Sequence, residues 1–267
     1  MKKFRFDKKN VILTGASSGI GKQMAKVLVE KYGCTVYAVA RNEEKLNAAE
    51  NEISAEKFVP FCFDVGSAGD WQRLRTSLSE KGVIADVLIN CAGVLPKFSP
   101  FENTGVEKIE EIMRTNFFSQ VYSAKTFLCD IKKNGGGIIN FSSSSSLCPF
   151  ALVSSYCASK AAAERFCECL AEENRDILVS CVMPGFIKTD IMRNQTASDK
   201  EKKIIDKISG NCEKSVNKIL NRIIRRKRRI IVGADAHFMN FAFRFFPSLA
   251  PRLITKILKK SNMRIFN

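Results

Sequence analysis

The strongest constraint on the fold is a repeated alternation of short apolar runs, rich in β-branched residues, with longer segments of helical periodicity. Such alternation is typical of βαβ units, in which a buried parallel strand is followed by a helix that crosses back over the sheet. The predicted strands span 11–14, 35–40, 58–64, 87–90, 137–142, 178–183 and 230–232. The predicted helices lie near 20–31, 42–54, 68–81, 103–133, 154–174 and 213–227. The sequence therefore predicts a doubly wound, Rossmann-type α/β fold with a parallel sheet of seven strands, whose ligands bind at the carboxyl ends of the strands.

The chain of 267 residues, 45% of them hydrophobic, predicts one domain, because no Pro/Gly/Ser-rich linker is long enough to separate two. We expect a sheet domain over 1–233 and a basic helical extension over 234–267 packed on the same domain. Ten cysteines without CxxC pairs and a single histidine, His237, argue against a metal site and favour a reducing, cytoplasmic location. The apolar run near the N-terminus is too short for a signal peptide.

The net charge of +16 is concentrated in the C-terminal quarter, since residues from 200 onward hold 18 Lys and Arg against 4 Asp and Glu. This asymmetry suggests an anionic partner, either nucleic acid or a membrane surface, or else a solvated surface. The run "RRKRR" at 225–229 follows a predicted helix and precedes the last strand, which favours a solvated helix end. No nucleic-acid partner is expected, because no base-reading module accompanies the charge.

A glycine-rich segment, "TGASSGIGK" at 14–22, joins the first predicted strand to the first predicted helix. Gly15, Gly19 and Gly21 allow a tight turn and a close approach of backbone to a pyrophosphate, while the helix N-terminus offers free N–H groups and a positive dipole. Because a strand precedes the segment and a helix follows it, the segment predicts a dinucleotide site.

The spacing T-G-x-x-x-G-x-G resembles that of the short-chain dehydrogenase/reductase family, and further motifs follow in the family's order over about residues 8–233. These motifs are Asp64-Val65, "NCAG" at 90–93, Asn116, "SSYCASK" at 154–160 and "PGFIKT" at 184–189. Cys91 departs from the family, which more often has Asn there, and we expect a change in packing without loss of function. The resemblance implies an NAD(P)-dependent oxidoreductase that interconverts an alcohol and a carbonyl.

Tyr156 and Lys160 lie four residues apart in a predicted helix, so both project from one face. A phenol with a pKa of about 10 is a poor base at neutral pH, but a cation about 4 to 6 Å away favours the phenolate. We therefore expect Lys160 to lower the pKa of Tyr156, which then exchanges a proton with the substrate while hydride moves to or from nicotinamide.

The resemblance implies further roles at this site. Lys160 would also hold the nicotinamide ribose, Asn116 would support a water in a proton relay, and Ser143, thirteen residues before Tyr156, would donate a hydrogen bond to the substrate oxygen. The neighbouring serines 142 and 144–146 are expected to end the strand and line the loop. The implied cofactor contacts are Gly15, Ser17, Ser18, Gly19, Ile20, Gly21, Arg41, Asp64, Val65, Asn90, Ala92, Gly93, Tyr156, Lys160, Pro184, Gly185, Ile187 and Thr189.

The end of the second predicted strand bears on the choice of cofactor. Ala40 stands where an NAD enzyme of the family usually has an acidic residue, and Arg41 follows it. A guanidinium pairs well with a ribose 2′-phosphate, so NADP(H) is predicted over NAD(H).

The substrate is predicted to be hydrophobic, such as a steroid, bile acid, retinoid or lipid ketone. Candidate pocket walls besides Ser143 are Leu95, Phe150, Phe186 and Met192, with a substrate cover over about 186–212. A 3-oxoacyl or other lipid-intermediate reductase is an alternative, as is a non-catalytic NADP-binding regulatory or scaffold protein. The presence of all four residues of the proposed relay speaks against the latter.

The C-terminal extension reads as two basic amphipathic helices. Phe238, Phe241, Ala242 and the phenylalanines at 245 and 246 share one face, and a second helix is expected after Pro247 and Pro251. These helices either pack on the domain or on another subunit, or contact an anionic membrane surface. Their composition and position resemble the extension of the 11β-hydroxysteroid dehydrogenase-like branch. The family resemblance also implies a homodimer or homotetramer.

Overall fold

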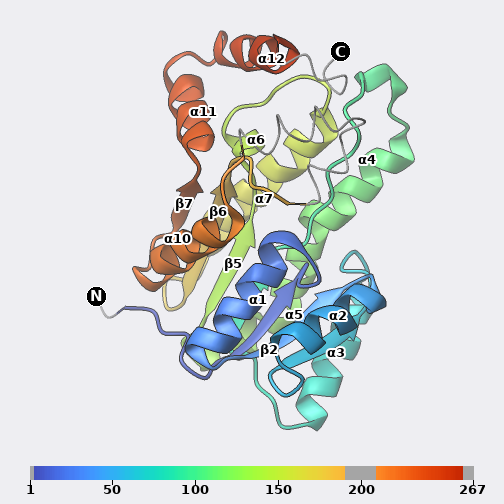
Figure 1. The fold of residues 1–267 in the computed structure, drawn as a ribbon, viewed down its shortest axis with the longest axis vertical. Helices are drawn as coiled ribbons and strands as arrows, with labels where there is room; N and C mark the ends of the chain where they lie inside the picture. Colours follow the sequence, from blue (N-terminus) through green and yellow to red (C-terminus); the bar gives the residue numbers. More distant parts are fainter. Residues whose placement is uncertain (1–2, 190–208, 261–267) are drawn as a thin grey trace.

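A parallel sheet of seven strands organises the chain in a computed structural model, which describes residues 3–189 and 209–260 (Figure 1). The strand order is β3-β2-β1-β4-β5-β6-β7, and every neighbouring pair is parallel. The strands are β1 (Asn10–Thr14), β2 (Thr35–Ala40), β3 (Phe58–Cys62), β4 (Val87–Asn90), β5 (Gly137–Phe141), β6 (Leu178–Pro184) and β7 (Arg229–Val232). The winding reverses between β1 and β4, which opens a crevice at their carboxyl ends. The predicted fold is confirmed, with strand bounds correct to within two residues.

Helices cover both faces of the sheet. The helices of the described residues are α1 (Gly19–Tyr32), α2 (Glu43–Ile53), α3 (Ala68–Glu80), α4 (Val106–Met113), α5 (Ser119–Lys133), α6 (Ser144–Leu147), α7 (Ser154–Glu173), α10 (Cys212–Ile224), α11 (Ala234–Phe245) and α12 (Ala250–Lys260). A 3₁₀ turn η1 (Phe101–Asn103) and a π-helical segment η2 (Arg114–Phe118) accompany them. The helices α1, α2 and α10 share one core with the sheet, and α3, α5 and α7 share the other. Within β4, Val87 and Ile89 face the first layer and Leu88 the second, as the alternation of a strand requires.

The predicted helix over 103–133 is wrong in its start and in its regularity. The chain forms η1 first, and α4 begins only at Val106, after Gly105. The segment η2 then interrupts the α-helical hydrogen bonding between α4 and α5. Side chains satisfy carbonyl groups in this segment, because Ser119 Oγ donates to Thr115 O (2.6 Å) and Gln120 Nε2 donates to Asn116 O (3.1 Å). Such π segments are frequent at functional sites.

The basic run at 225–229 lies between α10 and β7. Arg228 Nη1 is 2.8 Å from Glu172 Oε1, and Arg229 Nη2 is 3.1 Å from Glu164 Oε1. Both carboxylates belong to α7, and the Glu164 side chain is only 2% exposed. These contacts indicate an ion-paired edge between α7 and β7.

The helices α11 and α12 follow the last strand and lie together at one end of the molecule (Figure 1). Their inner faces, including Met239, Ala242 and Ile254, form a third apolar cluster with Cys148. The second helix starts before Pro251 rather than after it, because the first turn of a helix tolerates a proline that lacks an N–H donor. None of the helices in the described ranges has the length and apolar composition needed to cross a membrane.

Candidate active site

The turn between β1 and α1 builds a cradle for a dinucleotide phosphate. Gly15 has a φ of 70°, and a Cβ at Gly21 would overlap the carbonyl oxygen of Gly15, so both positions require glycine. Thr14 Oγ1 accepts hydrogen bonds from the N–H groups of Cys91 and Ala92 (3.0 and 2.9 Å), which fixes the loop after β4 beside this turn. No side chain caps the N-terminus of α1. Its first N–H groups and the positive end of its dipole therefore suit an anionic pyrophosphate, and the residues present fit a dinucleotide.

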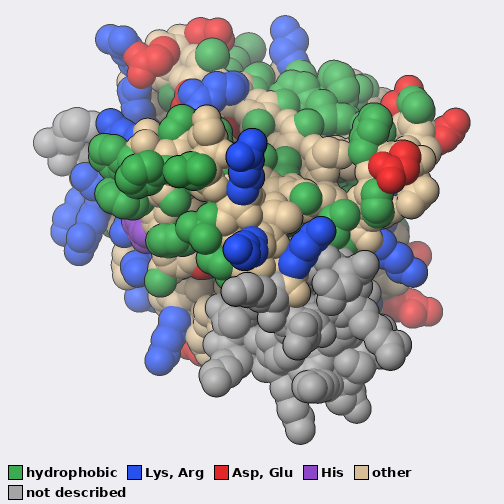
Figure 2. Space-filling model, turned by 90° about the horizontal axis from the view of Figure 1, so that it is seen from above, with side chains coloured by type: hydrophobic (Ala, Val, Ile, Leu, Met, Phe, Trp, Pro, Cys, Tyr) green, Lys and Arg blue, Asp and Glu red, His purple; other side chains and the backbone are tan. Residues whose placement is uncertain are grey.

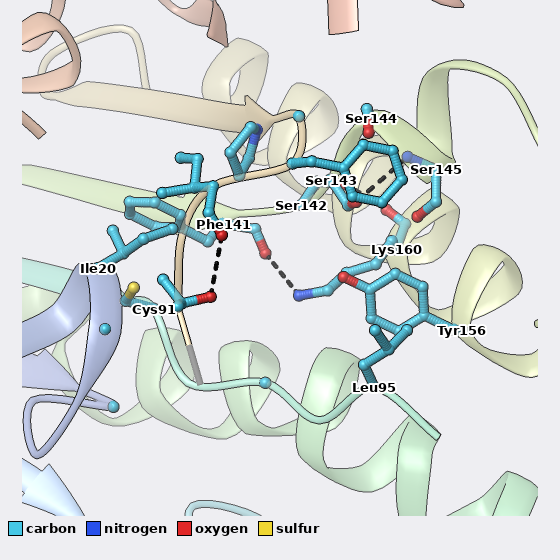
Figure 3. A pocket seen from close by; sticks show the side chains of 18 of the residues that line it. Ile20, Cys91, Leu95, Phe141, Ser142, Ser143, Ser144, Ser145, Tyr156 and Lys160 are labelled. Carbon is cyan, nitrogen blue, oxygen red and sulfur yellow. Dashed lines mark hydrogen bonds between the residues drawn. The ribbon is translucent and has the colours of Figure 1, made fainter. Parts of the chain in front are cut away.

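Ser143, Tyr156 and Lys160 meet in one cavity at the carboxyl edge of the sheet (Figure 3). Tyr156 and Lys160 lie one turn apart on α7, and Lys160 Nζ is 5.9 Å from the centre of the Tyr156 ring. Lys160 is 4% exposed, and its Nζ donates to the Phe141 carbonyl at the end of β5 (3.2 Å). The side chains of Ser143 and Tyr156 both line this cavity. The predicted trio is therefore assembled around a common space.

Burial moves the pKa values of this pair in opposite directions. Burial raises the pKa of Tyr156 to about 12, although the nearby Ser143 side chain lowers it in part. Burial also lowers the pKa of Lys160 to about 8, because a charged amine is poorly solvated there. The expectation that Lys160 lowers the pKa of Tyr156 stays a prediction, because in the ligand-free structure desolvation is the largest cause of the shift and raises the pKa.

Asn116 lies in the π-helical segment, and its side chain is fully buried. Its Oδ1 accepts from Val94 N (2.8 Å), while its Nδ2 donates to Val94 O (2.9 Å) and Ser159 Oγ (3.0 Å). A Cβ at Gly93 would lie 3.2 Å from both Asn116 Oδ1 and Lys160 Nζ, so glycine at this position leaves room for both side chains. The amide therefore holds the loop after β4 against α7.

The serine run at 142–146 has several distinct functions. Ser142 Oγ lies at hydrogen-bond distance from the Lys160 carbonyl (2.7 Å) and ties the end of β5 to α7. Ser143 is the N-cap of α6, since its Oγ accepts from Ser145 N (3.2 Å). Ser146 Oγ donates to Ser143 O (2.7 Å). The expected loop is thus a short helix, α6, and Ser145 Oγ is buried in the cavity region with no hydrogen-bond partner in the described chain.

Most of the predicted cofactor residues line this cavity. Those that do are Gly15, Ser18, Gly19, Ile20, Gly21, Ala92, Gly93, Tyr156, Lys160, Pro184, Gly185, Ile187 and Thr189. The others lie outside its lining: Ser17, Arg41, Asp64, Val65 and Asn90. Val65 is a core residue, and Asn90 is buried in a polar network, because its Nδ2 donates to Asn140 Oδ1 (2.9 Å) and its Oδ1 accepts from Ser123 Oγ (2.9 Å).

The apolar wall of the cavity contains Leu95, Phe150 and Phe186, as predicted, and also Phe98, whose ring stacks on Phe150 at 6.5 Å. Met192 and most of the predicted cover over 186–212 lie outside the described residues. The sequence interpretation missed Phe98 and Gln120. Gln120 Nε2 donates to Phe141 O (3.0 Å), the same carbonyl that Lys160 contacts, and only its place one turn after Asn116 could have suggested this.

The fold and the site together define a class of protein. A glycine turn suited to a dinucleotide stands at the switch point of a doubly wound sheet, next to a buried Tyr–Lys pair with a serine hydroxyl. These are the parts of a nicotinamide-dependent oxidoreductase site.

Comparison with known proteins identifies the family. A family model described as short chain dehydrogenase matches residues 9–200. The chain is 31% identical over 229 residues to 11-beta-hydroxysteroid dehydrogenase A of Sesamum indicum, covering 85% of this chain and 65% of that protein. It is 30% identical over 187 residues to the NADPH-dependent pterin aldehyde reductase of Arabidopsis thaliana, covering 69% and 77% of the two chains. The chain belongs to the short-chain dehydrogenase family.

A solved structure supports the fold. A short chain dehydrogenase from Burkholderia cenocepacia, crystallised in complex with NADP, matches with a TM-score of 0.76 at 24% identity, over 91% of this chain and 96% of that one. The chain spans just under two thirds of the length of the sesame relative.

Proposed function

We propose that the protein is an NADP(H)-dependent oxidoreductase that interconverts a carbonyl and a secondary alcohol on a hydrophobic substrate. The observation that carries the proposal is the meeting of Ser143, Tyr156 and Lys160 in the cavity that also holds the glycine turn. The family membership of the chain supports the reaction class.

Each residue has a defined task in this reaction. A bound NADP(H) supplies or accepts the hydride. Tyr156 gives its proton to the substrate oxygen during reduction and takes it back during oxidation. Ser143, which lines the same cavity as Tyr156, holds the same oxygen and stabilises the charge that develops there. Lys160 places a cation 5.9 Å from the centre of the Tyr156 ring and would hold the nicotinamide ribose, and Asn116 holds the loop after β4 in place.

Replacing Tyr156 with Phe tests this mechanism. Loss of the phenol proton is expected to lower kcat by roughly 10²- to 10⁴-fold, while the Kd for NADPH stays close to that of the wild type. Turnover is measured from NADPH absorbance and binding from fluorescence titration. Tyr122→Phe is the matched control, because Tyr122 stacks on Phe118 outside the cavity. Turnover by Tyr156→Phe equal to that of Tyr122→Phe would rule out the mechanism.

The preference for NADP(H) rests on Arg41. Arg41 is exposed directly after β2, and the residue before it is Ala40, so no carboxylate stands at the strand end to repel a 2′-phosphate. The names of the pterin aldehyde reductase and of the Burkholderia complex, which refer to NADPH and NADP, support the same choice. Arg41→Ala is expected to lower kcat/KM for NADPH by about tenfold or more and to leave that for NADH nearly unchanged. Equal losses with both cofactors would contradict the preference.

The hydrophobic substrate class rests on the cavity wall. Leu95, Phe98, Phe150 and Phe186 face the space beside the catalytic trio, and an apolar wall with a few polar groups suits a steroid, bile acid or lipid-like carbonyl. The sesame relative bears the name of a hydroxysteroid dehydrogenase, which supports this class. A screen of steroids, bile acids and lipid ketones that follows NADPH absorbance would identify the substrate.

We also propose a homo-oligomer in a reducing, cytoplasmic compartment. Phe117, Phe118, Tyr122 and Phe166 form an aromatic group across η2, α5 and α7, and Phe118 is 41% exposed, so this surface offers apolar area to a second copy. All ten cysteines are free thiols, which supports a reducing compartment. Light scattering after size exclusion measures the oligomeric state.

A further inference from the structure

The outer faces of α11 and α12, with the turn between them, expose an apolar surface that we call the tail surface. It consists of Phe238, Phe241, Phe245, Phe246, Leu249, Leu253 and Ile257, each 46–61% exposed. Only four other large hydrophobic side chains are comparably exposed in residues 3–189 and 209–260, so apolar exposure is concentrated in this short segment. The rings of Phe241 and Phe245 lie 4.8 Å apart. A concentrated apolar surface of this kind marks an interaction site.

The charge around the tail surface has one sign. The exposed cations Arg244, Arg252, Lys256 and Lys259 lie on the same two helices. The sequence holds no Asp or Glu after Asp235. Figure 2, which views the molecule from this end, shows hydrophobic and basic side chains side by side on this face. The partner of the tail surface must therefore combine apolar and anionic groups.

We propose that the tail surface docks on an anionic lipid membrane. A bilayer offers acyl chains to the phenylalanines and phosphate or carboxylate headgroups to the cations, which is the pairing that basic amphipathic helices use at membrane interfaces. With 12 and 11 residues, the helices are about 18 and 16 Å long at 1.5 Å per residue, short of a hydrocarbon core about 30 Å thick. They therefore lie along the interface.

A second copy of the chain fits the tail surface less well. A two-fold interface places the same surface on both sides, so the four exposed cations of one copy would meet a surface that carries the same four cations. With no carboxylate in the segment after Asp235, nothing in it would neutralise them. Like charges brought together in this way oppose association, whereas an anionic bilayer attracts the same charges.

The inner faces of the same helices connect this surface to the substrate site. Met239, Ala242 and Ile254 pack in one cluster with Phe150 and Phe186, which line the catalytic cavity. Docking would thus hold the apolar wall of the cavity close to the lipid. An apolar substrate dissolved in the membrane would then have a short path to the site.

Co-sedimentation of the full chain with vesicles tests the proposal. Phosphatidylcholine vesicles with phosphatidylserine are expected to bind the chain, and phosphatidylcholine vesicles alone to bind it far less. Phe241→Ser/Phe245→Ser is expected to lower the partition coefficient roughly 100-fold, from the loss of two inserted rings. Arg252→Gln/Lys256→Gln/Lys259→Gln is expected to lower it by about the same factor, since each surface cation contributes roughly fivefold.

Matched controls separate docking from folding. Ile84→Ser removes a side chain that is 49% exposed just before β4, and Lys214→Gln/Lys218→Gln/Arg225→Gln removes three exposed charges on or next to α10. Both controls should bind vesicles like the wild type, and all variants should retain NADPH binding. The proposal is overturned if phosphatidylserine vesicles do not bind the chain, or if tail-surface and control variants bind equally. It is also overturned if the tail-surface variants change the oligomeric state and leave vesicle binding intact.

Discussion

Replacing Lys160 with Met should stabilise the ligand-free protein while abolishing its activity. Burial lowers the pKa of Lys160 from its ordinary 10.5 to about 8. Each pH unit corresponds to about 1.4 kcal/mol, so the buried ammonium costs roughly 3 kcal/mol of folding free energy at pH 7. The substitution also removes the hydrogen bond to Phe141 O, worth about 1 kcal/mol, but Gln120 Nε2 still donates to that oxygen. The expected net gain is about 2 kcal/mol.

The difference in folding stability between the wild type and Lys160→Met should depend on pH. The unfolded chain holds the lysine proton up to about pH 10.5, whereas the folded chain releases it near pH 8, so wild-type stability rises with pH across this window. Subtracting the Lys160→Met curve removes the contributions of groups that the two proteins share. Urea unfolding of both proteins from pH 7 to 10 measures the difference, and Lys125→Met, an exposed lysine of α5, is the control. A flat difference curve, or a Lys160→Met protein less stable than wild type at pH 7, would refute the reasoning.

Two further substitutions test the cavity. Gly21→Ala places a Cβ on the Gly15 carbonyl and should weaken NADPH binding by about tenfold or more. The control is Gly69→Ala in α3, where a Cβ meets nothing within 4 Å; it should leave binding unchanged and stabilise the helix by about 0.5–1 kcal/mol. Equal NADPH affinities of the two variants in fluorescence titrations would contradict the steric argument. Ser145→Ala removes a buried hydroxyl that has no hydrogen-bond partner in the described residues, so the free energy of urea unfolding should stay the same or rise by about 1 kcal/mol. If the hydroxyl binds substrate, the same variant should raise KM by roughly fivefold. An unchanged KM would assign the hydroxyl to packing.

The sequence predicted the sheet well because most strands are short apolar runs that are buried on both faces and rich in β-branched residues. It also predicted which residues meet at the site, because the carboxyl ends of parallel strands lie at one edge. It failed at η2 because a π segment depends on side chains such as Gln120 that satisfy carbonyl groups across several elements. Similarly, the inner and outer faces of α11 both carry apolar residues, so periodicity alone could not say which face is buried.

The upward shift of the pKa of Tyr156 shows why the site cannot be understood from residue spacing alone. Four-residue spacing places the amine near the phenol, but it says nothing of how much water remains around them. Burial desolvates the phenol, and the pKa of Tyr156 rises to about 12 in consequence. A phenol that keeps its proton at neutral pH is the form that protonates a substrate oxygen, whereas alcohol oxidation requires the phenolate. In the proposed mechanism the protonated phenol is therefore ready to donate its proton in carbonyl reduction, and alcohol oxidation requires that proton to be lost first.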